Sequence, residues 1–315
     1  MTSQSKILFA VILVLALIAT GIIWGLERFS FYTLPTRGGI STTIEVAASP
    51  DIFEWVQAAA TNFNSSNSQI TVTVVEVDSK RIDTVFSGTG DELPDAWIPE
   101  AGFVAQQNGS SAYNRTGLSV ASDSLLWAKP TEQPYTLEWN AINEAAVNDR
   151  QFNIALPANN NTTAIASCLS AAQSYHQTTE LDFSLANDAG FKDWYREIEA
   201  AIPNATDPLA QLLRRPPAID VVMITDSDGA QLQGVFQLTD PLYDVAFDFP
   251  YVTRSSWAEL STDEAAAKQT AVDRFYNELI SSGNQSDLAN YGLSESIPTP
   301  EYSSRTIQAL SWCWQ

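Results

Sequence analysis

The sequence predicts an α/β protein built on a mostly parallel sheet with helices on its faces. Short runs rich in β-branched residues alternate with helical runs along most of the chain. The first strand, residues 43–47, leads through Ser49 and Pro50 directly into a helix. A second strand, turn and helix of the same kind occupies residues 152–176. This second unit predicts a second α/β lobe.

The first half of the chain follows this alternation in order. Ser49 is placed as the N-cap and Pro50 as the first residue of a helix whose apolar positions 52, 53, 56 and 60 have helical spacing. The further elements that the two periodicities predict are a strand at 70–77, a short helix at 82–86, a brief strand at 94–99 and a strand at 122–128.

The second half continues the pattern with longer helices. The predicted elements are a helix at 139–147, a strand at 152–157, a helix at 164–176, helical stretches over 181–202, a helix ending at 213, a strand at 219–225, extended segments within 242–251, an amphipathic helix at 264–281 and a short helix ending near Gly292. We find no internal repeat and no low-complexity tract.

The amino-terminal segment predicts a membrane anchor. Ile7 to Leu26 is almost unbroken apolar sequence, and its twenty residues match the thickness of a bilayer core. A cleavable signal peptide is the alternative. Lys6 and the amino terminus put positive charge on the short side, which predicts an extracytoplasmic location for the remainder. We therefore expect a transmembrane signal-anchor at 1–28 and a linker at 29–40.

Composition limits the classes of partner and cofactor. The chain has 16 basic and 37 acidic residues and a net charge of −21, which argues against nucleic acid and anionic lipid headgroups as partners. Two cysteines and one histidine make a Cys/His zinc site improbable. We expect neither a cofactor nor a structural metal.

The residues that could support catalysis do not form a recognisable motif. His176 is the single histidine, and no G-x-S-x-G sequence occurs, so we expect a helix-end surface residue rather than a hydrolase base. Asp240, Asp244 and Asp248 are spaced by four in an extended segment, which favours a solvated acidic edge over paired catalytic carboxylates. The Asp226–Gly229 sequence DSDG is interpreted as a turn. The chain is not expected to be an enzyme.

The junction at Ser49 is the most informative local feature. A strand that runs into a capped helix gathers free backbone N–H groups, the positive end of a helix dipole and a hydroxyl at one point. Such a point can receive a small polar or anionic group, although a serine in this position can also act only as a cap. Cys168 and Cys313 form an even pair outside the cytoplasm, which permits a disulfide but leaves two buried thiols as the alternative.

Six segments of the chain carry a family resemblance. In chain order they are IEVAASPDIFEWV, LPDAWIPEAGF, ASDSLLWAKP, FNIALPANNNTTAIASCL, FDFPYV and AVDRFYNELISSGNQSDLANYGL. Together, over about residues 44–293, they resemble the extracellular solute-binding proteins of the periplasmic-binding-protein type II fold. The subgroup that the chain resembles includes molybdate-type and phosphate-type binders and is also found fused to von Willebrand factor A domains. The chain differs from that family at 159–161, where three asparagines replace residues that are often Ser or Gly.

The resemblance implies two lobes joined by two crossing segments, with a ligand between them. The first lobe would comprise residues 41–127 and 245–315, and the second residues 128–244. The positions that match the family's ligand-binding residues are Ser49, Ser79, Trp97, Ser122, Ser124, Thr162 and Thr163. Lys80, Arg81 and Trp127 are additional candidates for the cleft. A bridge between Cys168 and Cys313 would then tie the tail across the lobes.

Two functions follow as hypotheses. The first is a membrane-anchored, extracytoplasmic solute-binding protein that captures a small polar or oxyanion ligand for the permease of an ABC-type transporter or for a sensor. The alternative is a degenerate binding fold that acts as a cell-surface protein-interaction or assembly module, with the cleft filled by its own side chains.

Overall fold

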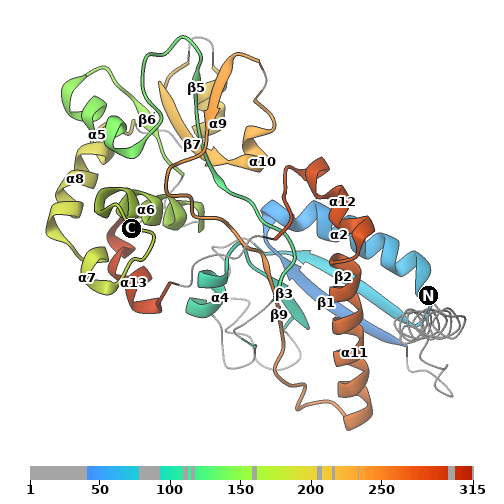
Figure 1. Cartoon of the computed structure of the whole chain (residues 1–315). Helices are drawn as coiled ribbons and strands as arrows, with labels where there is room; N and C mark the ends of the chain where they lie inside the picture. Colours follow the sequence, from blue (N-terminus) through green and yellow to red (C-terminus); the bar gives the residue numbers. More distant parts are fainter. Residues whose placement is uncertain are drawn as a thin grey trace, which may run out of the picture. The chain divides into compact units, whose positions relative to one another are not determined.

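The chain after the amino-terminal segment is organised around two β-sheets (Figure 1). The computed structural model describes residues 41–77, 93–108, 113–114, 118–157, 162–203, 208–214, 217–232, 234–296 and 302–313. The predicted anchor at 1–28 and linker at 29–40 lie outside these residues, as does the predicted helix at 82–86. Among the described helices, none has the length and apolar character needed to span a bilayer.

The first sheet has five strands in the order β2-β1-β3-β9-β4. Strand β1 (Thr42–Ala48) pairs in parallel with β2 (Ile70–Glu76) and with β3 (Ala96–Ile98), as the alternating β-branched runs predict. Strand β9 (Pro250–Thr253) returns antiparallel to β3, and the short strand β4 (Leu118–Ser119) pairs with β9. The three parallel strands therefore end at one edge of the sheet.

Two long helices pack against this sheet and against each other. Helix α2 (Pro50–Ser66) follows β1 directly, and helix α11 (Thr262–Leu279) comes from the carboxyl-terminal part of the chain. The rings of Phe63 and Phe275 meet edge to face with their centroids 5.6 Å apart. A capping box at Ser261 fixes the start of α11, because the Ser261 hydroxyl accepts from a backbone N–H three residues into the helix.

A buried carboxylate joins these elements. Asp95, which precedes β3, is 4% exposed. Its Oδ2 accepts from the Glu45 backbone N–H (2.9 Å) and from the Lys268 ammonium (2.7 Å), and its Oδ1 accepts from the Trp257 indole N–H (2.6 Å). Asp95 therefore connects β1, α11 and the segment between β9 and α11.

The second sheet has four strands in the order β6-β7-β5-β8. Strand β6 (Ile154–Ala155) runs parallel to β7 (Val221–Thr225), and β5 (Leu125–Pro130) runs antiparallel to both β7 and β8 (Phe236–Thr239). Strands β5 and β7 are buried along their whole length, which explains their largely apolar sequences; the buried exceptions are Lys129 and Thr225.

Helices surround this sheet. They are α5 (Trp139–Asn148), α6 (Thr162–His176), α7 (Phe183–Ala186), α8 (Ala189–Glu199) and α9 (Pro208–Leu213). Trp127 of β5 is fully buried against Trp139 of α5, and the ring centroids lie 4.8 Å apart in an edge-to-face arrangement. Most side chains of α6 between Thr162 and Ser174 are buried, so this helix lies in the core of the second part of the molecule.

The segments that cross between the two sheets are hydrogen-bonded to one another. Ser122 exchanges two backbone hydrogen bonds with Ser294, and Asp123 exchanges two with Phe247. The strand predicted at 122–128 therefore begins only at Leu125, because the two residues at its start pair with other chain segments rather than with the second sheet. The segment at 294 is a third crossing, beyond the two that the resemblance implies. It follows α12 (Ser282–Asp287) and the 3₁₀ turn η3 (Leu288–Tyr291).

The carboxyl-terminal segment packs on the helices of the second sheet. It contains α13 (Ser304–Ala309) and the 3₁₀ turn η4 (Ser311–Cys313). The Trp312 ring lies 5.6 Å, centroid to centroid, from both Phe191 and Tyr195 of α8. The predicted membership of residues 245–315 in the first lobe stays a prediction. The predicted boundaries between the two lobes, at 127/128 and at 244/245, also stay predictions.

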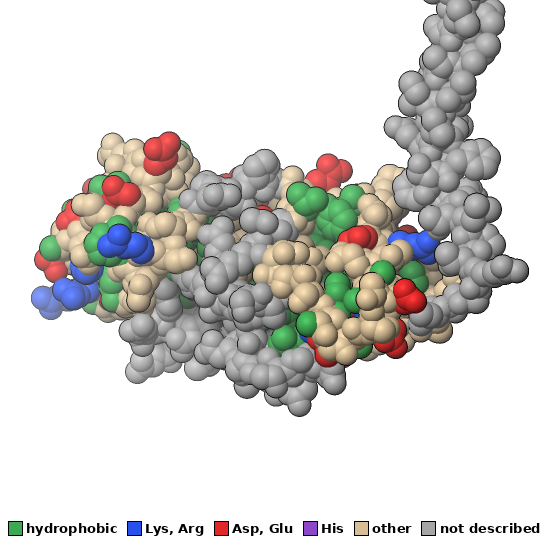
Figure 2. Space-filling view, turned by 90° about the horizontal axis from the view of Figure 1, so that it is seen from below, with side chains coloured by type: hydrophobic (Ala, Val, Ile, Leu, Met, Phe, Trp, Pro, Cys, Tyr) green, Lys and Arg blue, Asp and Glu red, His purple; other side chains and the backbone are tan. Residues whose placement is uncertain are grey.

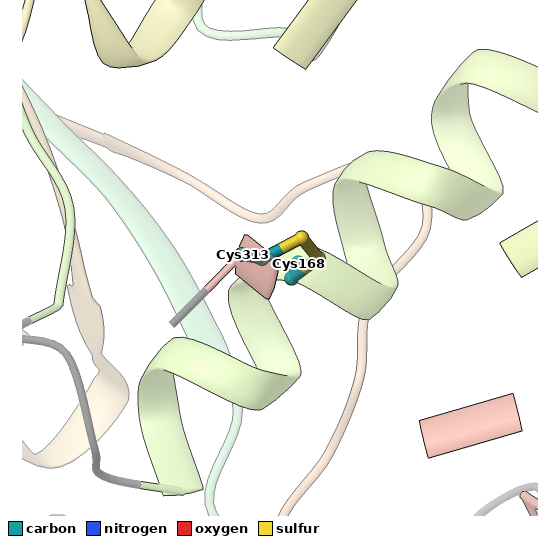
Figure 3. The surroundings of a disulfide bond; sticks show 2 residues. All are labelled: Cys168 and Cys313. Atoms are coloured by element: carbon teal, nitrogen blue, oxygen red, sulfur yellow. A yellow bond between two sulfur atoms is a disulfide. The ribbon is translucent and has the colours of Figure 1, made fainter. Parts of the chain in front are cut away.

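A disulfide between Cys168 and Cys313 fixes this segment (Figure 3). Cys168 lies in the middle of α6 and is fully buried, and the two Cα atoms are 6.2 Å apart. Tyr302, at the start of the same segment, accepts a hydrogen bond from the Gln173 amide at 3.0 Å and lies edge to face with Phe103 of α4 (Gly102–Asn108), 6.3 Å away. Since α4 follows β3, the tail contacts both parts of the molecule.

Charged side chains are sparse on one face of the molecule. On the face shown in Figure 2, scattered acidic side chains and a few basic ones lie among hydrophobic side chains and uncharged groups. This is the surface expected from a chain with 37 acidic and only 16 basic residues.

Candidate functional site

Ser49 lies where β1 ends and α2 begins. Its backbone N–H donates to the carbonyl of Ile98 at 3.0 Å, which places it at the carboxyl edge shared by β1 and β3. Its backbone is extended, as expected for an N-cap, but its hydroxyl makes no cap hydrogen bond. Ser49 is 1% exposed, and its Oγ has no hydrogen-bond partner among the described residues. A buried hydroxyl without a partner is rare and marks a place where a further polar group fits.

Glu100 lies at the same edge and contacts the start of α6. It follows β3, is 5% exposed, and its backbone carbonyl accepts from the N–H of Phe249 at 3.2 Å. Thr162, the first residue of α6 and 3% exposed, donates its hydroxyl proton to Glu100 Oε2 at 2.7 Å. Ser49 and Glu100 thus lie just beyond the carboxyl ends of the neighbouring parallel strands β1 and β3. The start of α6 therefore contacts the residue that closely follows β3.

The two helix starts give this place its electrostatic character. Each amino terminus presents the positive end of a helix dipole. In α2 the first residue is Pro50, which has no N–H, and the Ile52 N–H donates to the Ser49 carbonyl at 3.2 Å. Helix α2 carries Asp51 in its first turn, whereas the first turn of α6 contains no acidic residue. The carboxylate that lies near the first residue of α6 comes from Glu100 instead. Glu100, Ser49 and Thr162 define the candidate site.

The two predicted serines of the crossing segments have structural partners. Ser122 is 1% exposed, and its hydroxyl donates to the carbonyl of Glu295 at 2.6 Å. The Ser124 side chain is hydrogen-bonded to the carboxylate of Asp244, and its backbone N–H donates to Asp123 Oδ1 at 2.8 Å. Both serines therefore hold the crossing segments together, and their predicted contact with a ligand stays a prediction.

Acidic groups gather at the crossing. Asp123 is 3% exposed, and its Oδ2 accepts from the Ser227 hydroxyl at 2.6 Å, at the start of the short helix α10 (Asp226–Gly229). Burial raises the pKa of Asp123 to about 6, although hydrogen bonds from Ser227 and Ser124 oppose the shift. Burial and the neighbouring charge of Asp123 also raise the pKa of Asp226 to about 6.

This cluster predicts a pH-dependent stability. A carboxyl whose pKa is higher in the folded than in the unfolded state contributes stability below about pH 4 that is lost as the pH rises through about 6. Asp123→Asn should remove this loss, because the Asn oxygen still accepts from Ser124 and its amide can donate to Ser227. We expect the variant to gain about 2 kcal/mol relative to wild type between pH 4 and pH 7.

Urea unfolding of both proteins at pH 4.5, 5.5 and 7 measures this difference. Asp193→Asn is the matched control, because its carboxyl is 78% exposed. Parallel pH profiles for wild type and Asp123→Asn would contradict the assignment.

The remaining sequence-predicted candidates are distributed as follows. Trp97 is 1% exposed in the core around β3, and Trp127 is fully buried. Thr163 is half-buried beside Thr162 at the start of α6. Ser79, Lys80, Arg81 and Asn159 to Asn161 lie outside the described residues. Ser49 lies at the end of β1 and Thr162 contacts Glu100 beyond the end of β3, and their predicted role in one ligand site stays a prediction.

The candidates for catalysis and metal binding have other surroundings. His176 is not a surface residue: its side chain is 11% exposed, and its Nε2 lies 3.0 Å from the carbonyl of Leu185. The carboxylate of Asp248 accepts from the N–H of Gly102 at 2.6 Å and so caps α4 rather than lining an acidic edge. The described residues contain no group of His, Cys, Asp and Glu side chains arranged to hold a metal ion.

Sequence reasoning missed Glu100 and Asp123. A weak signal existed for each: Glu100 follows a strand that ends in Pro99, and Asp123 lies between the two serines of the crossing. An acidic residue in an otherwise apolar and neutral string is a candidate for burial with a partner. The partners themselves are distant in sequence, since 62 residues separate Glu100 from Thr162 and 104 separate Asp123 from Ser227.

Comparison with known proteins shows the fold. Neither a protein-family model nor a curated protein matches the chain. Among solved structures, it is similar to the sulfate-binding protein SubI of Mycobacterium tuberculosis, with 12% identity, 87% of this chain and 92% of that chain covered, and a TM-score of 0.54. It is also similar to the Trichodesmium protein IdiA (FutA) in complex with iron and citrate, with 11% identity, 87% and 100% coverage, and a TM-score of 0.56.

A third similar structure is the maltose/maltodextrin-binding domain MalE of Bdellovibrio bacteriovorus bound to maltotriose, with 12% identity, 86% coverage of each chain and a TM-score of 0.55. These matches confirm an α/β fold of the periplasmic-binding-protein type, with two sheets and flanking helices. At such low identity they show the fold alone.

Proposed function

We propose that this chain is a solute-binding protein that holds a small polar ligand at the shared edge of β1 and β3, against the starts of α2 and α6. The observation that carries the proposal is the Ser49 hydroxyl, buried at the start of a 17-residue helix without a partner among the described residues. Support comes from the fold, since the similar structures are described as binding sulfate, iron with citrate, and maltotriose.

The proposed site needs no covalent chemistry. The Ser49 hydroxyl can both donate to and accept from a ligand, and the positive end of the α2 dipole lies beside it. Thr162 and Glu100 would add polar groups from the start of α6 and from the end of β3. The crossing segments at Ser122–Ser294 and Asp123–Phe247 are the natural hinge for opening and closing around the ligand.

The location and partners are part of the same proposal. Residues 1–28 would anchor the protein on the extracytoplasmic side of a membrane, where it would deliver ligand to the permease of an ABC-type transporter or report occupancy to a sensor. The Cys168–Cys313 disulfide supports an oxidising compartment.

One observation favours a second candidate, an interaction module without a ligand. The Glu100 carboxylate already lies at the start of α6, where the resemblance implies a ligand. A cleft filled by the protein's own side chain would not need a solute. Ligand binding and its dependence on Ser49 separate the two candidates.

Thermal unfolding in the presence of candidate solutes tests the proposal. The chain from residue 39 onward contains the compact unit Thr42–Gln315 and suits the screen. A solute at one hundred times its Kd should add about 2.7 kcal/mol, which corresponds to a rise of roughly 5–10 °C in the Tm. We expect such a saturable shift with one class of small polar solute.

Ser49→Ala should abolish this shift while the Tm without ligand changes little, because the Ser49 hydroxyl makes no bond to the described residues. Ser281→Ala is the control, since Ser281 is another helix N-cap serine without a side-chain cap bond, and its hydroxyl accepts only from the Asn284 amide at 3.4 Å. A shift that survives Ser49→Ala would remove the site from this edge. The absence of a shift with any solute would favour the interaction module.

A further inference from the structure

Strand β8 forms one edge of the second sheet, and its inner side pairs with β5. The carbonyl of Val235 accepts from the N–H of Thr131 at 3.0 Å, so alternate residues from Val235 onward direct their backbone groups at β5. The backbone groups of Phe236 and Leu238 therefore point outward. In the part of the chain that the structure describes, these outward groups have no hydrogen-bond partner.

Two other edge strands have outward groups that are paired within the chain. On β2, the N–H of Val72 donates to Asn64 Oδ1 at 2.8 Å, and its carbonyl accepts from the Asn64 amide at 2.9 Å. On β6, the N–H of Ile154 donates to the carbonyl of Ala201 at 3.1 Å. An edge covered in this way cannot add a strand, whereas an open edge is a template for one. The outer side of β8 therefore fits another extended strand.

The charge of this edge limits the kind of strand that fits. Residues 229–239 contain no charged side chain, although the chain has a net charge of −21. Val235 is 57% exposed and Leu238 39% exposed. A neutral, partly apolar strand has no group that would recognise an acidic or a basic partner. A second copy of the same strand does fit, because two acidic molecules can meet here without placing like charges opposite each other.

The hydrogen-bonding pattern of β8 is complementary to itself. In an antiparallel pairing of two copies centred on Gln237, Phe236 of each copy lies opposite Leu238 of the other. Each such pair exchanges two N–H···O bonds, so the two pairs satisfy all the outward groups of both strands. The Phe236 ring and the Leu238 side chain then lie side by side on one face of the joined sheet. Asp240 falls opposite Gly234 of the other copy, so no acid faces an acid.

We propose that β8 is the docking edge for a second copy of this chain, and that the two copies pair β8 against β8 around a twofold axis and join their four-stranded sheets into one. The contact is short, so the dimer should dissociate on dilution. This inference goes beyond the proposed function and does not depend on solute binding.

Cysteine cross-linking of the full chain in mild detergent tests the inference. Gln237→Cys places a thiol at the twofold axis, where the two Cα atoms would lie about 4.5 Å apart, within the range that a disulfide spans. Cys168 and Cys313 are already bonded to each other, so the new thiol is the one available to react. Under mild oxidation it should form disulfide-linked dimers at least about tenfold faster than Gln57→Cys, the matched control on the exposed side of α2.

Two further variants test the register and the hydrogen bonds. In Thr239→Cys the two thiols would lie four residues apart along the paired strands, about 13 Å, so this variant should cross-link no faster than Gln57→Cys. Leu238→Pro, added to Gln237→Cys, removes an outward N–H that β5 does not use, and should slow cross-linking at least about tenfold. Leu238→Lys opposes the pairing through an edge charge instead, which provides a test if the proline variant does not fold.

Cross-linking of Gln237→Cys at the rate of Gln57→Cys or of Thr239→Cys overturns the inference, since it would reflect random collision or another register. Undiminished cross-linking in the folded Leu238 variants overturns it as well. A fast reaction that is confined to Gln237→Cys and is lost with the Leu238 substitutions supports the twofold β8 interface.

Discussion

Removal of the Cys168–Cys313 disulfide is expected to lower the free energy of unfolding by about 2–5 kcal/mol. The bridge joins residues 145 apart, so it excludes many extended conformations of the unfolded chain. For a chain of this size the loss corresponds to a fall in the Tm of roughly 5–15 °C. The variant to measure is Cys168→Ala with Cys313→Ala, because alanine places no new polar group in the buried site of Cys168.

Calorimetry of this double variant and of wild type before and after reduction measures the effect. The reduced wild type is the matched control, since it loses the bridge without losing the two side chains. Hydrogen exchange should also rise in residues 302–313, which are then held only by contacts such as those of Trp312 with Phe191 and Tyr195. A Tm within 1 °C of wild type would mean that this packing alone fixes the tail.

Sequence periodicity predicts well those strands whose side chains alternate between buried and exposed, and those helices that begin at a recognisable cap. The first sheet's β1 and β2 combine β-branched residues with alternating burial, and α2 begins at a serine and a proline. Helix α11 begins at a capping box. For such elements local sequence and tertiary packing favour the same structure, and the mixed α/β fold follows from their order.

Short and exposed elements were not predictable in the same way. Strand β8 is half exposed on both faces, and α13 has six residues, so neither carries a periodic signal. The start of β5 is displaced because Ser122 and Asp123 pair with segments more than a hundred residues away. Such pairings depend on the assembled fold and leave no mark in the local sequence.

The candidate site shows the same division. Ser49 could be predicted from the sequence because it lies at a strand-to-helix junction that is formed by adjacent residues. The contact of Glu100 with Thr162 joins the edge of one sheet to a helix beside the other, and only the relative placement of these elements creates it. A family resemblance transfers the serine and the threonine but gives no signal for the acid between them.

The substitution Asp95→Ala is expected to cost about 3–5 kcal/mol of stability, which makes it the most destabilising single change considered for the first sheet. It leaves three donors without their acceptor: the backbone N–H of Glu45, the indole N–H of Trp257 and the ammonium of Lys268. The Lys268 side chain is only 26% exposed, so water compensates the lost ion pair only in part. Thermal and urea unfolding measure the loss, with Asp193→Ala as an exposed control.

A double-mutant cycle with Lys268→Met tests whether the ion pair carries the effect. If it does, the double variant should be more stable than the sum of the two single losses predicts, by about 1–3 kcal/mol. Additive losses would show that the two neutral donors dominate. Asp95 lies in the Pro-Asp string that supports the family resemblance. Its hydrogen-bond partners, however, lie in β1, in α11 and in the segment between β9 and α11, outside the candidate site. The Asp95→Ala protein that still folds should therefore bind solute with wild-type affinity. A loss of affinity in folded Asp95→Ala would instead extend the site to the amino-terminal end of β3.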